Sequence, residues 1–248
     1  MENKEWFKNW FNSPYYHLLY NNRNEDEAVA FIKKLTAYFQ LKVNSKILDV
    51  ACGKGRHSKA LADMGYDVTG IDLALESIVE AKKDEAENLH FYTQDMRLPF
   101  WINYFDVAFN LFTSFGYFRT QREHNNAIRS IAQSIKQEGI LVIDYLNVNY
   151  EETHFENLQE KKIEDYTFIV KKWHTDTHFY KQIQVKESYK EQPIDLSTER
   201  VAKFSLEDFR KMLLLQQMHI QNVFGDYSLG EYSEDSSLRL IIIAKKLL

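Results

Sequence analysis

Apolar runs and helix-like patterns alternate along the chain up to residue 145. Mostly apolar runs, which are typical of strands, lie at residues 46–51, 66–72, 89–93, 104–109 and 140–145. Apolar residues spaced three and four apart, which indicate helices, lie at residues 25–40, 56–64, 75–87 and 120–137. Strands that alternate with helices in this way predict a doubly wound α/β fold, in which a mostly parallel sheet carries helices on both faces.

The rhythm changes in residues 150–204. Apolar residues alternate with polar ones at Tyr166, Phe168, Val170, Ile183 and Val185. This pattern predicts two or three antiparallel strands with one face in water, inserted after the fifth strand. At the carboxyl edge of the sheet such an insertion would form either a cap over a ligand or a dimerisation surface, and the sequence leaves both open. After it, residues 205–248 return to a helix and strands.

Composition narrows the classes of function. The 248 residues carry a net charge of −5 with a pI near 5.9, which gives no general attraction to nucleic acid or to an anionic membrane. No apolar stretch approaches the length of a membrane span, and the first residues do not open a signal peptide, so we expect a cytoplasmic protein. The single cysteine, Cys52, excludes a disulfide framework and suits a reducing compartment.

The loop after the first predicted strand carries the clearest chemical signal. Residues 47–57 pass from an apolar run through Asp49 to a loop with Gly53 and Gly55, and then into a helical pattern. Glycine lets the backbone approach a ligand closely, and the start of the following helix offers free N–H groups. Proteins of the α/β class hold nucleotide-like cofactors in this way at the carboxyl edge of the sheet.

Two further acids follow the next two strands. Asp72 lies about 20 residues past the glycine loop, where an acid is placed to accept hydrogen bonds from ribose hydroxyls. Asp95 follows the third strand. Three successive strands each ending near an acid favour a nucleotide cofactor over a simple tight turn at the two glycines.

Together these residues resemble motif I and its neighbouring motifs in the class I S-adenosylmethionine (SAM)-dependent methyltransferases. Motif I has an acid followed by glycines at alternate positions; here Ala51 replaces the first glycine, and we expect it to keep a negative φ. The resemblance implies SAM as the cofactor. It also implies a seven-stranded sheet that ends in an antiparallel hairpin, with strands near 219–224 and 238–244.

The same resemblance implies the cofactor contacts. Asp95 would accept from the adenine amine, and the backbone N–H of Met96 would meet the ring. The expected cofactor-binding residues are Asp49, Ala51, Gly53, Gly55, Asp72, Leu73, Asp95, Met96, Asn110, Tyr16, Tyr20 and Arg23. The last-named three belong to an aromatic N-terminal segment, residues 1–24, which we expect to pack as a short helix that caps the domain.

Acceptor contacts are expected after the fourth and fifth strands. The fourth strand ends at Asn110, but the Asp/Asn-Pro-Pro-Tyr/Phe sequence of enzymes that methylate base amines is matched only at its first position. Phe112, Tyr117 and Tyr145 are expected to line an apolar, aromatic acceptor wall. No motif marks a catalytic base, and none is assigned. We expect no metal site, because His174 and His178 fall on a predicted hairpin tip rather than at helical spacing.

The leading hypothesis is a SAM-dependent methyltransferase that acts on an oxygen or nitrogen nucleophile of a small molecule. A tRNA or protein methyltransferase and a non-catalytic SAM-binding module remain alternatives. An NAD-dependent oxidoreductase is disfavoured, because its fingerprint requires a third glycine where Ser58 stands. The predicted organisation is a cap segment over 1–24, a core over 25–149 and 205–248, and the insertion over 150–204, with a homodimer as one use of that insertion.

Overall fold

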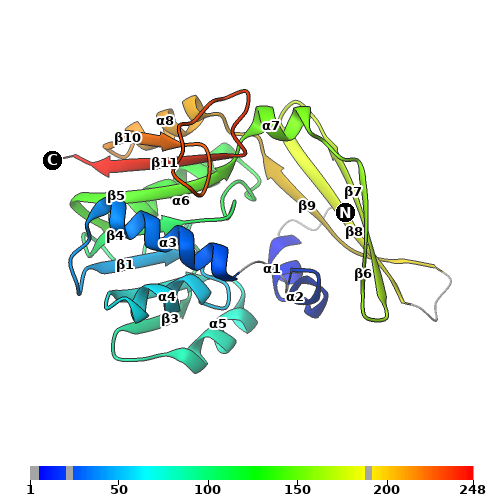
Figure 1. The fold of residues 1–248 in the computed structure, drawn as a ribbon, viewed down its shortest axis with the longest axis horizontal. Helices are drawn as coiled ribbons and strands as arrows, with labels where there is room; N and C mark the ends of the chain where they lie inside the picture. The colour runs from blue at the N-terminus through cyan, green and yellow to red at the C-terminus, as the bar shows by residue number, and fades with distance from the viewer. Residues whose placement is uncertain (1–5, 21–24, 188–191, 248) are drawn as a thin grey trace.

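The computed structural model describes residues 6–20, 25–187 and 192–247. Figure 1 shows a seven-stranded sheet with helices on both faces, here called sheet A, and a separate four-stranded sheet, here called sheet B, with two short helices between them. No described helix is both long enough and apolar enough to cross a membrane.

Sheet A has the strand order β3-β2-β1-β4-β5-β11-β10. Its strands are β1 (Lys46–Val50), β2 (Asp67–Asp72), β3 (Leu89–Thr93), β4 (Phe105–Asn110), β5 (Ile135–Leu146), β10 (Met218–Phe224) and β11 (Arg239–Lys246). The first five strands in the chain are parallel, whereas β11 runs antiparallel to both β5 and β10. The predicted seven-stranded, mostly parallel sheet with a closing hairpin is therefore confirmed.

Helices cover both faces of sheet A, as predicted. They are α3 (Glu25–Phe39), α4 (Arg56–Asp63), α5 (Leu75–Ala81) with a 3₁₀ turn at Lys82–Asp84, α6 (Gln121–Ser134) and α8 (Leu206–Leu214). The apolar residues of α3, α4 and α5 share one core with Val142 of β5, whereas those of α6 and α8 share another with Leu141 and Ile143. Because neighbouring residues of a strand point to opposite faces, β5 is buried on both sides, as its continuous apolar sequence indicates.

Two predicted helix ends are wrong. The helix expected over 120–137 ends at Ser134, because Ile135 pairs with Phe105 of β4 and is fully buried as the first residue of β5. Lys136 then reaches Asp106, with 2.7 Å between Nζ and Oδ1. The helix expected over 75–87 ends at Ala81 and continues only as the short 3₁₀ turn. Tertiary strand pairing, which helical periodicity does not reveal, fixes the first of these boundaries.

Sheet B has four antiparallel strands where two or three were predicted. They are β6 (Leu158–Ile163), β7 (Tyr166–His174), β8 (His178–Glu187) and β9 (Ile194–Ala202), and α7 (Val148–Thr153) connects them to β5. The additional strand β6 is almost entirely exposed and rich in charge, so it lacks the alternation by which a strand is recognised. The hairpin tip predicted between His174 and His178 is present, since β7 ends at one and β8 begins at the other.

The N-terminal helices α1 (Trp6–Phe11) and α2 (Pro14–Tyr20) lie between the two sheets (Figure 1). Trp10 and Leu19 are buried against Phe168 and other apolar residues on the inner face of sheet B. Phe7 instead joins the core of sheet A. The two helices therefore bridge the two sheets, because their aromatic side chains pack against both.

Candidate active site

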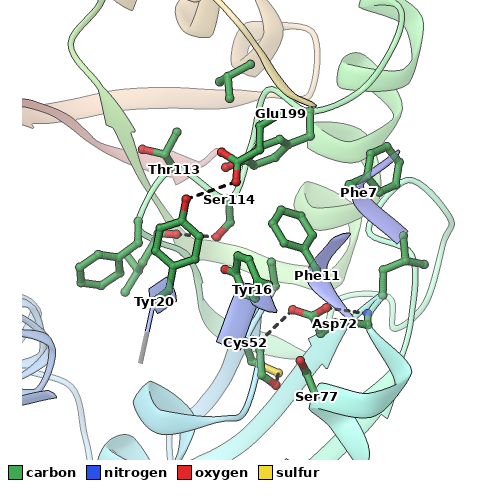
Figure 2. A pocket seen from close by; sticks show the side chains of 18 of the residues that line it. Phe7, Phe11, Tyr16, Tyr20, Cys52, Asp72, Ser77, Thr113, Ser114 and Glu199 are labelled. Carbon is green, nitrogen blue, oxygen red and sulfur yellow. Dashed lines mark hydrogen bonds between the residues drawn. The ribbon is translucent and has the colours of Figure 1, made fainter. Parts of the chain in front are cut away.

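A cavity of about 770 Å³ lies where the carboxyl ends of β1 to β4 meet α1, α2 and sheet B. Figure 2 shows Phe11, Tyr16 and Tyr20 of the N-terminal helices, Asp72 at the end of β2, and Cys52 of the loop after β1, all of which line this cavity. Ligands of open α/β sheets bind at this edge, outside the carboxyl ends of the strands.

The glycine loop between β1 and α4 forms the floor of the cavity. Gly53 has a φ of +57°, and a Cβ added there would meet no other atom within 4 Å, so its bare Cα faces open space in the cavity. Gly55 has a φ of +79°, and an added Cβ would lie 2.4 Å from the ring of Phe91. The first glycine thus leaves room for a ligand, while the second leaves room for the protein's own core.

Ala51 departs from the expectation of a negative φ, because its φ is +61°. The backbone N–H of Cys52 donates to the carbonyl of Ile71 at 3.0 Å, and this bond fixes the turn directly after Ala51. A residue with a Cβ in this left-handed region costs about 1–2 kcal/mol relative to the right-handed one. The loop therefore keeps the conformation of a glycine although the residue is alanine.

Asp49 lies at the end of β1, nearly inaccessible to solvent at 2% exposure, and also lines the cavity. The hydroxyl of Ser58, in the first turns of α4, donates to its Oδ2 at 2.6 Å. Burial raises the pKa of Asp49 to about 6, and the bond from Ser58 opposes that rise. A cationic ligand beside this carboxylate would favour its ionised form.

Asp72 ends β2 and accepts two backbone hydrogen bonds. The N–H of Gly53 donates to Oδ2 at 2.8 Å, and the N–H of Ala74 donates to Oδ1 at 2.7 Å. Burial raises the pKa of Asp72, and these backbone bonds oppose it. The carboxylate therefore fixes the glycine loop and the start of the segment before α5, and it lines the cavity between them.

Asp95 follows β3 and is bound by Arg97 from the same loop. The Arg97 Nη2 lies 2.7 Å from Oδ2 of Asp95, and its Nε lies 3.0 Å from Oδ1. Asp95 and Met96 both line the cavity. With Asp49 and Asp72, the acids after three successive strands therefore lie along one side of a single cavity, which is the arrangement that the sequence predicted.

Most of the residues expected at the site line this cavity. They are Tyr16, Tyr20, Asp49, Ala51, Gly53, Asp72, Leu73, Asp95, Met96, Phe112 and Tyr117. Gly55 supports the same loop from within the core. Arg23 lies outside the described residues.

Asn110 and Tyr145 do not line the cavity, and these two expectations are corrected. The Asn110 side chain is buried and donates through Nδ2 to the carbonyl of Val50 at 3.2 Å, so it joins β4 to β1. The Tyr145 hydroxyl is fully buried and donates to the carbonyl of Ala202, which joins β5 to the end of β9. Both residues stand at strand ends, but their side chains point into the protein interior, and strand position alone does not give that direction.

Residues from sheet B that the sequence analysis did not single out also line the cavity. Glu199 of β9 is paired in register with Lys181 of β8, and Lys181 with Lys172 of β7, so the three share one face. Glu199 accepts from Trp10 Nε1 at 2.7 Å and from the Tyr20 hydroxyl at 3.3 Å. The strand alternation of β8 was visible in the sequence, but not the direction in which its charged face points.

Arg239, the first residue of β11, is another lining residue without a sequence signal. Its Nε donates to Oδ1 of the fully buried Asp144 at 2.8 Å, and its Nη2 donates to Thr113 Oγ1 at 2.8 Å. Phe112 and Thr113 both have a positive φ, of 55° and 57°. Since the backbone N–H of Phe112 also donates to Asp144, at 2.7 Å, this buried pair holds the strained loop that borders the cavity.

Two residues with side chains that could accept a proton, His57 and Tyr117, also line the cavity. The imidazole of His57 stacks on the ring of Phe112, with centroids 4.9 Å apart. Among the described residues no group of three His, Cys, Asp or Glu side chains is arranged to hold a metal ion.

Comparison with known proteins agrees with this geometry. Residues 47–139 match the family model described as a methyltransferase domain. The putative methyltransferase YqeM of Bacillus subtilis is 36% identical over 107 residues, which are 42% of this chain and 43% of that protein. A dTDP-3-amino-3,4,6-trideoxy-alpha-D-glucopyranose N,N-dimethyltransferase of Streptomyces venezuelae is 29% identical over 100 residues, covering 40% and 42% of the two chains. The matches thus span less than half the length of these relatives.

The similarity in fold extends further than the similarity in sequence. A crystal structure of an S-adenosylmethionine-dependent methyltransferase from Clostridium acetobutylicum superposes with a TM-score of 0.78 at 18% identity, covering 94% of this chain and 96% of that one. Residues 47–139 therefore match a methyltransferase domain, and almost the whole chain has the fold of an S-adenosylmethionine-dependent methyltransferase.

Proposed function

We propose that this protein transfers the methyl group of SAM to an oxygen or nitrogen nucleophile of a small molecule. The observation that carries the proposal is the cavity wall formed by Asp49, Asp72 and Asp95 together with the open space at Gly53. A Cβ at Gly53 would extend into that space, so the loop fits a cofactor whose atoms approach the backbone closely. The sugar N,N-dimethyltransferase among the relatives supports the small-molecule acceptor class.

Each wall residue has a distinct part in holding the cofactor. Asp72 would accept from ribose hydroxyls, Asp95 from the adenine amine, and the buried carboxylate of Asp49 would favour the positive charges of SAM. When bound, SAM supplies a methyl group on a sulfonium, which an acceptor displaces in line. The protein's contribution is to hold the acceptor and to exclude water, which the aromatic side chains of α1 and α2 support.

The same cavity supports a division of the chain by role. We propose that residues 25–149 and 205–248 bind SAM, and that 1–24 and 150–204 cover the acceptor. Tyr16 from the first of these covering segments and Glu199 from the second line the cavity, which favours a cap over a surface used only for dimerisation.

The test combines ligand binding with a transfer assay. SAM and S-adenosylhomocysteine should raise the melting temperature, whereas NAD should not, because only ligands of the native state stabilise it. SAM with a labelled methyl group should then label a small-molecule fraction of a cell extract. Stabilisation by NAD alone contradicts the cofactor assignment. Label in the RNA or protein fraction favours the macromolecular acceptors, and binding without transfer favours a sensing module.

A further inference from the structure

Arg97 binds Asp95 in the side-on, two-point geometry that fixes a carboxylate most firmly. Nε and Nη2 of Arg97 lie 3.0 Å from Oδ1 and 2.7 Å from Oδ2, and the backbone N–H of Arg97 donates to Oδ1 at 2.9 Å. The two side chains are largely buried, at 15% and 14% exposure. Paired bonds between a planar guanidinium and a carboxylate fix the plane of the carboxylate as well as its position.

The guanidinium is itself held from several directions. Nη1 of Arg97 lies 2.9 Å from Oε1 of Glu123, in the first turn of α6. The rings of Phe118 and Phe7 lie 4.9 and 5.8 Å from the guanidinium carbon. Arg97 is thereby tied to a helix of the core and to α1, although it belongs to a loop.

This support matters because Asp95 lies in the loop between β3 and β4, outside any regular element. A side chain on a loop orients a ligand group accurately only when its neighbours lock its rotamer. We propose that Arg97 is a positioning residue, which fixes the Asp95 carboxylate for the exocyclic amine of the cofactor's adenine. It thereby sets the preference of the site for adenine over a purine without that amine.

The inference rests on the proposed function, since it assigns Asp95 to the adenine of SAM. Arg97 supplies three donors to the carboxylate, namely its backbone N–H, Nη2 and an Nε that is shared between the two oxygens, whereas a carboxylate offers about four lone-pair positions. An ion pair that only stabilised the loop would behave differently. Its loss would weaken binding of every cofactor analogue equally, whereas loss of a positioning residue weakens only the contact to the amine.

The experiment compares S-adenosylhomocysteine with S-inosylhomocysteine, which has a carbonyl oxygen in place of the amine. Calorimetry on the wild-type protein should give at least about tenfold tighter binding of the adenosyl ligand, as expected for one hydrogen bond to a charged group. In Arg97→Lys, which keeps the charge and loses the paired geometry, this ratio should fall about threefold to tenfold. Affinity for the inosyl ligand should stay the same or rise.

Two further variants control the result. Glu123→Gln releases one side of the guanidinium while keeping a residue that can cap α6, so it should lower the ratio in the same direction but less. If Arg97→Lys folds poorly, Glu123→Gln tests the positioning role in its place. Arg122→Lys is the negative control: it changes the exposed arginine that precedes Glu123 in α6, and it should leave the affinities for both ligands unchanged.

The outcomes separate this inference from the function beneath it. A wild-type protein that does not bind S-adenosylhomocysteine overturns the proposed function and the inference together. A wild-type protein that binds both ligands equally, or an Arg97→Lys protein that loses equal affinity for both, overturns the positioning role and leaves the methyltransferase assignment in place.

Discussion

The carboxylate of Asp72 accepts a hydrogen bond from the backbone N–H of Gly53 at 2.8 Å, so the acid that ends β2 holds the glycine loop that follows β1. Its other oxygen accepts from the N–H of Ala74 at 2.7 Å. Motif I and the second-strand acid are therefore one hydrogen-bonded unit in the folded chain. A cofactor that occupies the cavity meets a loop whose shape depends on Asp72.

Replacing Asp72 by alanine should weaken SAM binding by about 1–3 kcal/mol, because the ribose hydroxyls lose their acceptor and the loop loses a bond. Calorimetric titration with SAM measures this loss. Asp67→Ala is the matched control, since Asp67 begins the same strand at the opposite edge of the sheet and is partly exposed. Equal SAM affinity in folded Asp72→Ala and in wild type would rule out the ribose assignment.

Ala51→Gly should stabilise the protein by about 1 kcal/mol, because glycine adopts a φ of +61° without the strain of a Cβ. The gain is smaller than the full strain, since glycine also increases the entropy of the unfolded chain. Urea denaturation measures the difference in the free energy of unfolding. Ala62→Gly, in the helix α4, is the control and should destabilise by about 1 kcal/mol. A loss of stability in Ala51→Gly would show that the left-handed alanine carries no strain.

The fold could be predicted from the sequence because its signals are local. The strand at Leu89–Thr93 was placed at its observed ends. Gly65, two residues after the end of α4, has a φ of +88°, as a glycine after a helix C-terminus does. The boundary at Ser134 was missed, since it depends on a partner strand distant in the chain. The positive φ of Ala51 was missed for a similar reason, because a hydrogen bond from the next residue to β2 imposes it.

The residues of the candidate site likewise divide into those with a local sequence signal and those without one. The acids Asp49, Asp72 and Asp95 were found, because each follows a strand and parallel strands bring their ends to one edge. Arg239 and Glu199 carry no such signal: their partners, Asp144 and Trp10, lie 95 and 189 residues away in the chain. The part of the cavity at the ends of β1 to β3 can thus be predicted from the sequence, whereas the part that Glu199 and Arg239 line depends on contacts that only the folded chain brings together.

SAM affinity should fall as the pH is lowered from about 7 to about 5, because burial raises the pKa of Asp49 to about 6. Above this pKa the carboxylate is charged and favours the cationic cofactor; below it the carboxyl group is neutral and that attraction is lost. The fall should approach at most about tenfold per pH unit below the pKa. Calorimetry across this range measures it. In Asp49→Asn the same titration should be nearly flat, and a slope like that of wild type would assign the effect to another group.

The last prediction concerns Glu199, which joins both N-terminal helices to sheet B. Its carboxylate accepts from Trp10 of α1 and Tyr20 of α2 and lies 3.6 Å from the ammonium of Lys181, with only 12% of the side chain exposed. Glu199→Leu leaves these donors without their acceptor, which should cost about 1–3 kcal/mol. That cost weakens the docking of α1 and α2 over the cavity.

Two measurements test whether α1 and α2 dock more weakly in Glu199→Leu. Limited proteolysis should cut residues 6–20 faster in Glu199→Leu than in wild type, because local opening exposes the backbone. Stopped-flow fluorescence should show faster release of S-adenosylhomocysteine, because the aromatic residues that cover the cavity separate more often. Glu160→Leu, at an exposed acid of β6 in the same sheet, should change neither rate. Faster cleavage with an unchanged release rate would mean that α1 and α2 pack beside the cofactor without acting as its cover.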